Sequence, residues 1–356
     1  MNAHRLAKVR ERLAAEGLNA LLVTEPNNRR YMSGFSGTSG MVVITLQNTW
    51  LLTDFRYIEQ ASQQAPLFEV VEHHGDAVHT LKQLLKDAGA EKLGFDARHL
   101  TYAEYVKLAE ELRPIQLVST AEWVEQLRWV KEPEEIAQIR QAAAIADEAF
   151  RHVLTMLRPG LRERDVAAEL EYKMRQLGAS GPAFDTIVAS GPRSALPHGV
   201  AGERVLAAGD LVTLDFGARY HGYCSDLTRT VALGSVDGRL KEIYQIVLEA
   251  QEIGLSKIRA GMTGREADAL VRSHIAARGY GDAFGHATGH ALGLDIHESP
   301  SLSKRCETVL QPGMVLTVEP GIYLPGLGGV RIEDDVLLTS DGLEVLTGAP
   351  KHLIEL

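Results

Sequence analysis

Residues 209–217 read GDLVTLDFG, and residues 313–321 read GMVLTVEPG. Each stretch is an apolar, strand-like run that ends in one carboxylate, Asp215 or Glu319, with a glycine two positions later. Two helical stretches precede them in the same order: RPGL with RDVAA at 158–168, and RAGM with READA at 259–269. Such a repeat predicts one α/β domain with pseudo-twofold symmetry, in which Asp215 and Glu319 occupy equivalent places.

The chain of 356 residues is too long for one small module and suits two domains. We expect a smaller α/β domain at residues 1–125 and a second domain, which contains the repeat, at residues 126–356. In the first domain, apolar patterns predict strands at 18–23, 41–45 and 49–53 and helices at 78–86 and 102–112.

The composition is acidic, since 37 Lys and Arg against 47 Asp and Glu give a formal net charge of −10. That charge repels phosphate backbones, and no basic cluster offsets it, so we expect no nucleic-acid partner. Two cysteines, Cys224 and Cys306, are too few for a disulfide framework and suit a reducing compartment. No apolar run approaches the roughly 20 residues of a membrane span. We therefore expect a cytoplasmic protein with no membrane partner.

Two further acidic residues follow the repeated strands. Asp226 comes after Asp215 across a turn, and Glu333 comes after Glu319 across the glycine-rich turn 325–329. Each half is therefore predicted to be a hairpin with one carboxylate on each strand. Four converging carboxylates cannot all stay ionised, because like charges at close range raise one another's pKa values. Two divalent cations would balance them, and paired metals of this kind activate water for hydrolysis.

Four histidines lie near these acids. His286, His290 and His297 come between the two predicted hairpins, and His198 comes before the first. Glycines around His286 and His290 argue against the helix that an H-E-x-x-H zinc site requires, so we expect a loop or strand there. Only one of these two histidines then needs to be a metal ligand. Imidazole among carboxylates favours Mn²⁺, Co²⁺, Fe²⁺ or Zn²⁺ over Ca²⁺ and Mg²⁺.

The order Asp, Asp, His, Glu, Glu in these contexts resembles the M24 metallopeptidases, the pita-bread family of methionyl aminopeptidase, aminopeptidase P, prolidase and creatinase. Residues 126–356 resemble the pita-bread catalytic domain, and residues 1–125 resemble the creatinase/prolidase N-terminal domain. The resemblance implies an α/β (α+β) fold, a homodimer and a site for two divalent metal ions, with Mn²⁺ first and Co²⁺, Zn²⁺ or Fe²⁺ as alternatives. The metal ligands that it implies are Asp215, Asp226, His290, Glu319 and Glu333.

The resemblance also implies roles for the remaining histidines. His198 matches a histidine that contacts substrate near the scissile bond, His286 matches one that supports the metal ligands, and His297 matches one that polarises the carbonyl. Glu319 matches the carboxylate that carries the proton. The implied reaction is attack of a metal-bridging hydroxide on the peptide carbonyl, with the proton relayed to the leaving nitrogen.

Within the family, the N-terminal domain and the short spacing from Glu319 to Glu333 resemble the proline-specific branch, which cleaves Xaa-Pro bonds. Many dipeptide-restricted prolidases carry an arginine where this chain has Ser301, and that arginine can pair with the carboxylate of a dipeptide. We therefore expect an aminopeptidase P that acts on longer proline-containing peptides, with Xaa-Pro dipeptidase (prolidase) activity as the alternative. A non-enzymatic binding protein and a creatinase-like amidinohydrolase remain further alternatives.

Overall fold

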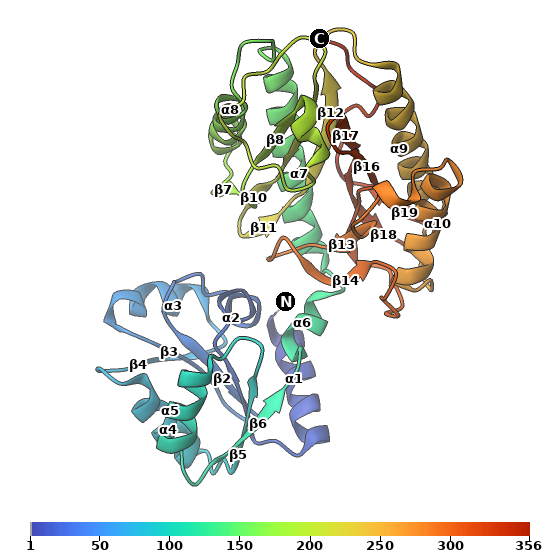
Figure 1. Cartoon of the computed structure of the whole chain (residues 1–356). Coiled ribbons are helices and arrows are strands. Elements are labelled where there is room, and N and C mark those ends of the chain that lie inside the picture. Colours follow the sequence, from blue (N-terminus) through green and yellow to red (C-terminus); the bar gives the residue numbers. More distant parts are fainter. Residues whose placement is uncertain (1) are drawn as a thin grey trace. The chain divides into compact units, whose positions relative to one another are not determined.

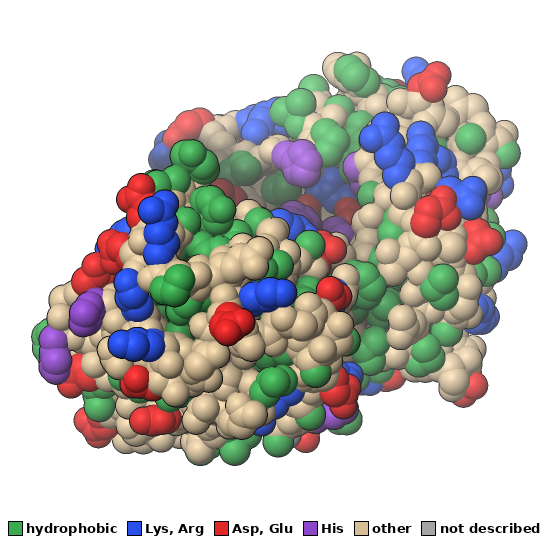
Figure 2. Space-filling model, turned by 90° about the horizontal axis from the view of Figure 1, so that it is seen from below, with side chains coloured by type: hydrophobic (Ala, Val, Ile, Leu, Met, Phe, Trp, Pro, Cys, Tyr) green, Lys and Arg blue, Asp and Glu red, His purple; other side chains and the backbone are tan. Residues whose placement is uncertain are grey.

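The computed structural model describes residues 2–356 (Figure 1). The chain divides into two units, Met1–Arg128 and Trp129–Leu356. Among the described residues, none of the helices combines the length and the hydropathy that crossing a bilayer requires. On the face that Figure 2 shows, acidic and basic side chains are interspersed, so that this face carries no extended field of one sign.

The first unit is built on one mixed sheet with the strand order β4-β3-β2-β1-β5-β6. Strand β1 pairs antiparallel with β2 and parallel with β5, so the sheet combines a meander with parallel crossovers. The two predicted strands at 41–45 and 49–53 are confirmed with the same bounds. The strands are β1 (Ala20–Val23), β2 (Met41–Thr45), β3 (Thr49–Thr53), β4 (Glu69–Glu72), β5 (Lys92–Asp96) and β6 (Gln116–Thr120).

Short amphipathic helices cover this sheet. In α4, Leu81 and Leu85 lie one turn apart and are both fully buried in the core of the unit. Helix α5 begins with a capping box, in which the side chains of Thr101 and Glu104 satisfy each other's backbone N–H groups. The helices are α1 (Asn2–Glu16), α2 (Pro26–Ser33), α3 (Ile58–Gln64), α4 (Ala77–Asp87), α5 (Tyr102–Glu111) and α6 (Trp123–Arg128).

The second unit places its strands between two pairs of helices, α7 and α8 on one side and α9 and α10 on the other (Figure 1). The helices are α7 (Pro133–Leu154), α8 (Glu163–Gln176), α9 (Gly238–Lys257) and α10 (Gly264–Ala277). The strands of the first half are β7 (Gly181–Pro182), β8 (Ile187–Ser190), β9 (Leu211–Phe216), β10 (Ala218–Tyr220), β11 (Tyr223–Cys224) and β12 (Leu227–Ala232). Those of the second half are β13 (Gly289–Ala291), β14 (Glu298–Leu302), β15 (Val315–Val318), β16 (Gly321–Leu324), β17 (Gly328–Arg331), β18 (Asp334–Leu338) and β19 (Leu343–Val345).

The sequence repeat appears as a repeated strand pattern. Strand β9 pairs antiparallel with β12, and between them the chain forms the short hairpin β10–β11 in another sheet. In the second half β15 pairs with β18, and the hairpin β16–β17 lies between them. The pseudo-twofold α/β fold is therefore confirmed, and so are the two hairpins with one carboxylate on each arm, because β10–β11 and β16–β17 continue the registers of β9–β12 and β15–β18.

The chain leaves each long strand pair for a local reason. After β9, a Cβ on Gly217 would lie 1.8 Å from the carbonyl oxygen of Ser225, so only glycine permits this close approach. After β15, Pro320 has no N–H group with which to continue the ladder to β18. The predicted extended run from Val330 to Thr339 is likewise divided into β17 and β18, with two residues between them.

Side-chain alternation in β9 sets the direction of Asp215. Leu214 and Phe216 pack into the core formed with α7 and α8. Because successive side chains of a strand point to opposite faces, Asp215 points away from that core. The strand therefore presents its single carboxylate to the face where the site is found.

Candidate metal centre

A cavity of about 440 Å³ in the second unit collects the polar residues of both halves. Its apolar wall includes Phe184, Ile187, Pro197, Val200 and Ile296. All the site residues predicted from the sequence line this one cavity: His198, Asp215, Asp226, His286, His290, His297, Glu319 and Glu333.

The four carboxylates lie where the long strand pairs break. Asp215 is the penultimate residue of β9, and Asp226 immediately precedes β12. Glu319 immediately follows β15, and Glu333 immediately precedes β18. Because each strand pair is interrupted at this point, one carboxylate from each strand end can face the cavity.

Asp226 and Glu333 are almost fully buried, and neither has a full set of hydrogen-bond partners. Oδ1 of Asp226 and Oε1 of Glu333 have no partner among the described residues. Burial raises the pKa values of both carboxyl groups well above the usual range, and each neighbouring carboxylate raises them further. Such groups either hold protons or need a cation, so the donor set fits divalent metal ions.

His290 completes this donor set. Its Nε2 lies 3.6 Å from Oδ2 of Asp226 and 3.4 Å from Oε1 of Glu319. Its Nδ1 lies 3.1 Å from the carbonyl oxygen of Ala291, which fixes Nδ1 as the protonated nitrogen and leaves the Nε2 lone pair toward the acids. Asp226, His290 and Glu333 each offer one ligand atom within 4.8 Å of the others.

His286 is engaged on both ring nitrogens. Nδ1 lies 2.8 Å from the carbonyl oxygen of Ala287, and Nε2 lies 2.8 Å from the hydroxyl of Tyr323. A nitrogen that accepts a hydrogen bond from tyrosine has no lone pair left for a metal. The structure thus distinguishes two histidines that the sequence spacing leaves equivalent, and it favours His290 as the ligand.

Arg331 is a cavity residue that sequence reasoning missed. It is buried, forms an ion pair with Oδ2 of Asp215, and donates to the Tyr323 hydroxyl at 2.8 Å. Its Nε also donates to Thr228 at 3.2 Å. The four acids therefore face the guanidinium of Arg331 as well as any metal. The prediction that two divalent cations balance the four carboxylates did not include this positive charge. The signal available in the sequence was a charged residue at the end of the otherwise uncharged strand β17.

Two threonines position the acids. Oγ1 of Thr228 donates to Oε2 of Glu333 at 2.5 Å. Oγ1 of Thr317 donates to Oε1 of Glu319 at 3.1 Å and accepts the backbone N–H of His290 at 3.0 Å. A Cβ on Gly289 would lie 1.9 Å from the carbonyl oxygen of Thr317, which explains the glycine directly before His290.

The remaining two histidines of the cavity, His198 and His297, are both exposed. The ring centroid of His297 lies 4.5 Å from that of His290. Partial desolvation and the neighbouring His290 lower the pKa of His297, which favours the neutral ring, a form that can donate one hydrogen bond. His198 lines the same cavity from the segment that follows β8.

Cys224 has no catalytic role in this arrangement. It is a fully buried residue of β11, and burial raises the pKa of its thiol to about 12. A thiol that stays protonated is a poor nucleophile. Cys224 is therefore a packed strand residue.

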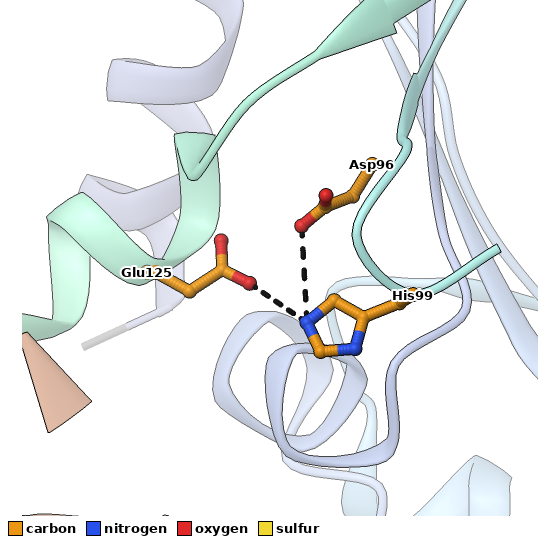
Figure 3. A group of neighbouring side chains, drawn as sticks. All are labelled: Asp96, His99 and Glu125. Atoms are coloured by element: carbon orange, nitrogen blue, oxygen red, sulfur yellow. Dashed lines mark hydrogen bonds and ion pairs between the residues drawn. The ribbon is translucent and has the colours of Figure 1, made fainter. Parts of the chain in front are cut away.

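A second group of potential metal ligands lies in the first unit, where His99 contacts Glu125 at 3.2 Å and Asp96 at 3.9 Å (Figure 3). These side chains are 39 %, 19 % and 20 % exposed, and Glu125 also accepts a hydrogen bond from Asn28. His99 bridges the two carboxylates, although Oδ2 of Asp96 and Oε2 of Glu125 have no hydrogen-bond partner among the described residues. We interpret this group as an ion-pair cluster that ties α6 to the end of β5.

Both units match known protein families. Residues 137–340 match metallopeptidase family M24, and residues 5–130 match the creatinase/prolidase N-terminal domain. The chain is 41 % identical to an Xaa-Pro dipeptidase of Pyrococcus furiosus over 352 residues, covering 98 % of this chain and 99 % of the relative.

Solved structures agree with these matches. An Xaa-Pro dipeptidase from Bacillus anthracis superimposes with a TM-score of 0.98 at 51 % identity and covers 100 % of both chains. An X-Pro aminopeptidase from Thermotoga maritima superimposes with a TM-score of 0.91 at 40 % identity, covering 96 % of this chain and 98 % of the other. The fold, the cavity and these similarities agree, and the chain belongs to metallopeptidase family M24.

Proposed function

We propose that this metallopeptidase is an Xaa-Pro dipeptidase, a prolidase. The observation that carries the proposal is the single cavity in which buried, incompletely partnered carboxylates and His290 face an apolar wall. The sequence favoured aminopeptidase P and kept prolidase as the alternative. The names of the relatives support the alternative better, because the Xaa-Pro dipeptidases of Bacillus anthracis and Pyrococcus furiosus are 51 % and 41 % identical to this chain, against 40 % for the X-Pro aminopeptidase.

Asp215, Asp226, His290, Glu319 and Glu333 are the residues that we propose hold two divalent metal ions. Bound there, the ions would lower the pKa of water and polarise the substrate carbonyl, the two contributions that metals make to hydrolysis. Carboxylate oxygens with one imidazole suit Mn²⁺, with Co²⁺, Zn²⁺ and Fe²⁺ as alternatives. Tyr323, whose pKa burial raises to about 12, and His286 keep the guanidinium of Arg331 directed at Asp215.

The chain's own residues supply the proton transfer. Burial raises the pKa of Glu319, which brings this carboxyl closer to the range where a proton carrier works. The nitrogen of an Xaa-Pro bond is tertiary, and it leaves as the amine of proline only after it is protonated. We propose that Glu319 delivers this proton, that the His297 ring donates to the carbonyl oxygen as negative charge develops there, and that His198 contacts the substrate at the cavity mouth.

The apolar wall supports proline as the residue after the cleaved bond. Phe184, Ile187 and Val200 offer carbon surface to a pyrrolidine ring, which has no N–H group to satisfy. A compact, rigid ring loses little conformational entropy on binding.

Ser301 favours a second candidate, aminopeptidase P. It lies opposite His290 in the ladder between β13 and β14, and its hydroxyl contacts that of Ser303 at 2.8 Å. No cation therefore stands at this position to pair with the carboxylate of a dipeptide. The X-Pro aminopeptidase from Thermotoga maritima also shares this fold.

Paired substrates separate the two candidates. We expect the Mn²⁺-loaded protein to hydrolyse Xaa-Pro dipeptides with a kcat/KM at least about 10-fold above that of the matching Xaa-Pro-Yaa tripeptides, an ordinary size for discrimination within one pocket. The reverse preference would establish aminopeptidase P activity. Hydrolysis of neither series by protein with bound metal would favour a non-enzymatic binding protein, and activity on creatine would favour an amidinohydrolase.

Removal of the metal should make stability depend on pH. Because the folded pKa values of Asp226 and Glu333 are raised, the metal-free fold binds their protons more tightly than the unfolded chain, whose carboxyl groups titrate near pH 4. That contribution is complete below about pH 4 and is lost as pH rises through the folded pKa values. Metal replaces the protons, so it stabilises most at high pH.

Thermal unfolding of EDTA-treated and Mn²⁺-loaded protein at pH 5, 6.5 and 8 tests this expectation. The difference in Tm between the two samples should widen as pH rises, and groups remote from the site cancel in that difference. A difference that is constant across pH would show that these carboxyls are already ionised in the metal-free fold.

We also propose a cytoplasmic homodimer. The two free cysteines, Cys224 and Cys306, support a reducing compartment, and the resemblance to the proline-specific branch supports the dimer. Sedimentation of the full chain measures the oligomeric state.

A further inference from the structure

The segment from Ser190 to Gly202 forms one wall of the cavity. It leaves the end of β8, makes a short 3-10 turn at Gly191–Ala195, and then presents Pro197, His198 and Val200 to the cavity. The side chain of His198 is exposed, so its location relative to the buried acids depends on how firmly the backbone of this segment is held.

One buried carboxylate holds both ends of the segment. Glu163 is the first residue of α8, and its side chain is fully buried. Oε1 accepts the backbone N–H of Ser190 at 2.9 Å and its hydroxyl at 2.7 Å. Oε2 accepts a hydrogen bond from the backbone N–H of Gly202 at 3.1 Å and forms an ion pair with Arg193. Arg193 also donates to the carbonyl oxygen of Val200 at 2.9 Å. The Glu163–Arg193 ion pair therefore ties the two ends of the segment together, and we call this pair the clasp.

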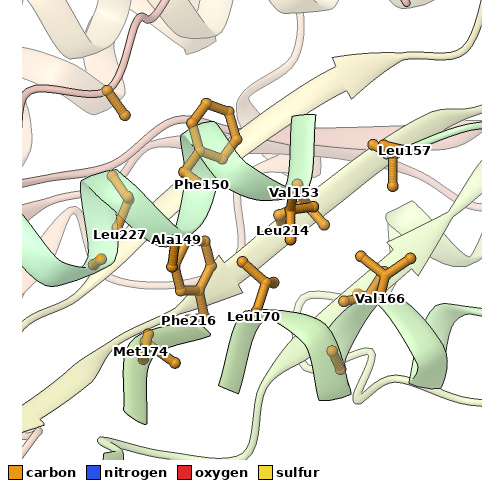
Figure 4. Packing of buried hydrophobic residues seen from close by; sticks show 14 of the residues in the cluster. Ala149, Phe150, Val153, Leu157, Val166, Leu170, Met174, Leu214, Phe216 and Leu227 are labelled. Carbon is orange, nitrogen blue, oxygen red and sulfur yellow. The ribbon is translucent and has the colours of Figure 1, made fainter. Parts of the chain in front are cut away.

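The helix that carries Glu163 rests on the strand that carries Asp215. Val166, Leu170 and Met174 of α8 pack against Leu214 and Phe216 of β9 (Figure 4). A close-packed contact of this kind is a rigid base. Glu163 is therefore fixed relative to the acid-bearing face of β9.

The middle of the segment touches the second half of the repeat. The hydroxyl of Ser194 accepts the backbone N–H of Gly329 in β17 at 2.8 Å and donates to the carbonyl oxygen of Gly191 at 2.6 Å. Strand β17 ends in Arg331, the partner of Asp215. The segment is thus held from α8 on one side and from β17 on the other.

We propose that Glu163 is a positioning residue for substrate recognition: with Arg193 it fixes the Ser190–Gly202 segment so that His198 meets the substrate at the cavity mouth. This inference rests on the proposed function, in which His198 contacts an Xaa-Pro substrate. Glu163 itself does not line the cavity and acts only through the segment. Removal of its charge leaves Arg193 without its partner and loosens both ends of the segment together.

A double-mutant cycle tests the coupling. Glu163→Gln keeps the side-chain shape and removes the charge that faces Arg193. We expect it to lower kcat/KM for an Xaa-Pro dipeptide by about 10- to 100-fold, the size expected when a substrate contact is misplaced. Combined with His198→Ala, it should cost no more than His198→Ala alone, and it should change kcat and KM in the same proportion as His198→Ala. Metal content should equal that of the wild type.

Glu203→Gln is the matched control. Glu203 is 68 % exposed, forms ion pairs with Arg162 and Arg164 next to the start of α8, and does not line the cavity. Glu203→Gln removes one negative charge near the start of α8, as Glu163→Gln does. It should leave kcat/KM unchanged, because exposed ion pairs contribute little to the stability of the structure around them. If Glu163→Gln does not fold, Arg193→Met breaks the same clasp from its partly exposed side and enters the same cycle.

The outcomes are distinct. If the losses in kcat/KM add, the double variant is worse than His198→Ala by the full effect of Glu163→Gln. That result would overturn the positioning role, because uncoupled residues contribute independently. An unchanged kcat/KM in Glu163→Gln would overturn it as well. A metal-loaded wild type that cleaves no Xaa-Pro peptide would instead refute the proposed function, and with it this inference.

Discussion

Replacing Glu333 by alanine should remove the bound divalent metal and abolish hydrolysis. Glu333 is fully buried, is held by Thr228, and lies with Asp226 and His290 in the tightest group of potential ligands in the second unit. Loss of one ligand leaves the others with too few donors and with unbalanced charge. Mutation of a residue that only hydrogen-bonds to a metal ligand already lowers metal affinity or activity by about 10- to 100-fold. We therefore expect loss of the ligand Glu333 itself to lower activity by more than about 100-fold.

Elemental analysis of the purified variant and steady-state hydrolysis of an Xaa-Pro dipeptide measure both effects. His290→Ala should behave in the same way. Retention of two metal ions per chain in either variant would contradict the ligand assignment.

Two substitutions serve as controls for this result. His297→Ala should lower kcat by about 100-fold while the metal content stays that of the wild type, because His297 is proposed to act on the carbonyl oxygen. His99→Ala disrupts the ion-pair cluster of the first unit and should change neither quantity. Metal loss in His297→Ala would move this histidine into the ligand set, and metal loss in His99→Ala would identify a second site.

Replacing Arg229 by methionine should destabilise the fold more than any change to a surface charge. Its side chain is 1 % exposed and donates to Oδ1 of Asp334 and to the carbonyl oxygen of Ala349, each at 2.7 Å. Burial alone would raise the pKa of Asp334, but Arg229 and Lys351 outweigh it and hold that pKa below its usual value. Removal of one partner of a buried ion pair costs about 3–5 kcal/mol, and we expect the lower end of that range here because Lys351 still pairs with Asp334.

Urea unfolding of metal-loaded protein measures the loss. Arg140→Met is the matched control, because Arg140 forms an ion pair with Glu344 at 2.7 Å in which both side chains are more than 40 % exposed. It should cost at most about 1 kcal/mol. Arg229→Met combined with Asp334→Leu should recover part of the stability. Equal effects of the two arginine substitutions would show that the buried pair is not important for the fold.

Arg229 also couples this network to the candidate metal centre. It donates to the backbone carbonyl of Glu333, next to Asp334 in the chain. Gln251 from α9 and Thr347 near the C-terminus donate to the same Asp334 carboxylate at 2.6 Å and 2.8 Å. The network therefore ties a helix and the C-terminal segment to the strand end that presents Glu333.

Local patterns accounted for much of the architecture. Alternation and turn residues predicted the strands at 41–45 and 49–53, and the two carboxylate-ended runs predicted the pseudo-twofold fold. They predicted the hairpins between β9 and β12 and between β15 and β18, but not that each hairpin end belongs to another sheet. There the outcome depends on the approach of Gly217 to Ser225 and on the ladder that Pro320 ends, which are contacts rather than propensities.

The sequence by itself determined that four carboxylates and several histidines follow two related strands, because burying charge in apolar runs is costly and therefore conspicuous. Tertiary structure alone decided how they are partnered. The pairing of Asp215 with Arg331, of Glu333 with Thr228, and of His286 with Tyr323 joins residues far apart in the chain. Partners that are far apart in the chain do not follow from any local periodicity of the sequence. Only the folded chain therefore shows which oxygen or nitrogen remains free to bind metal.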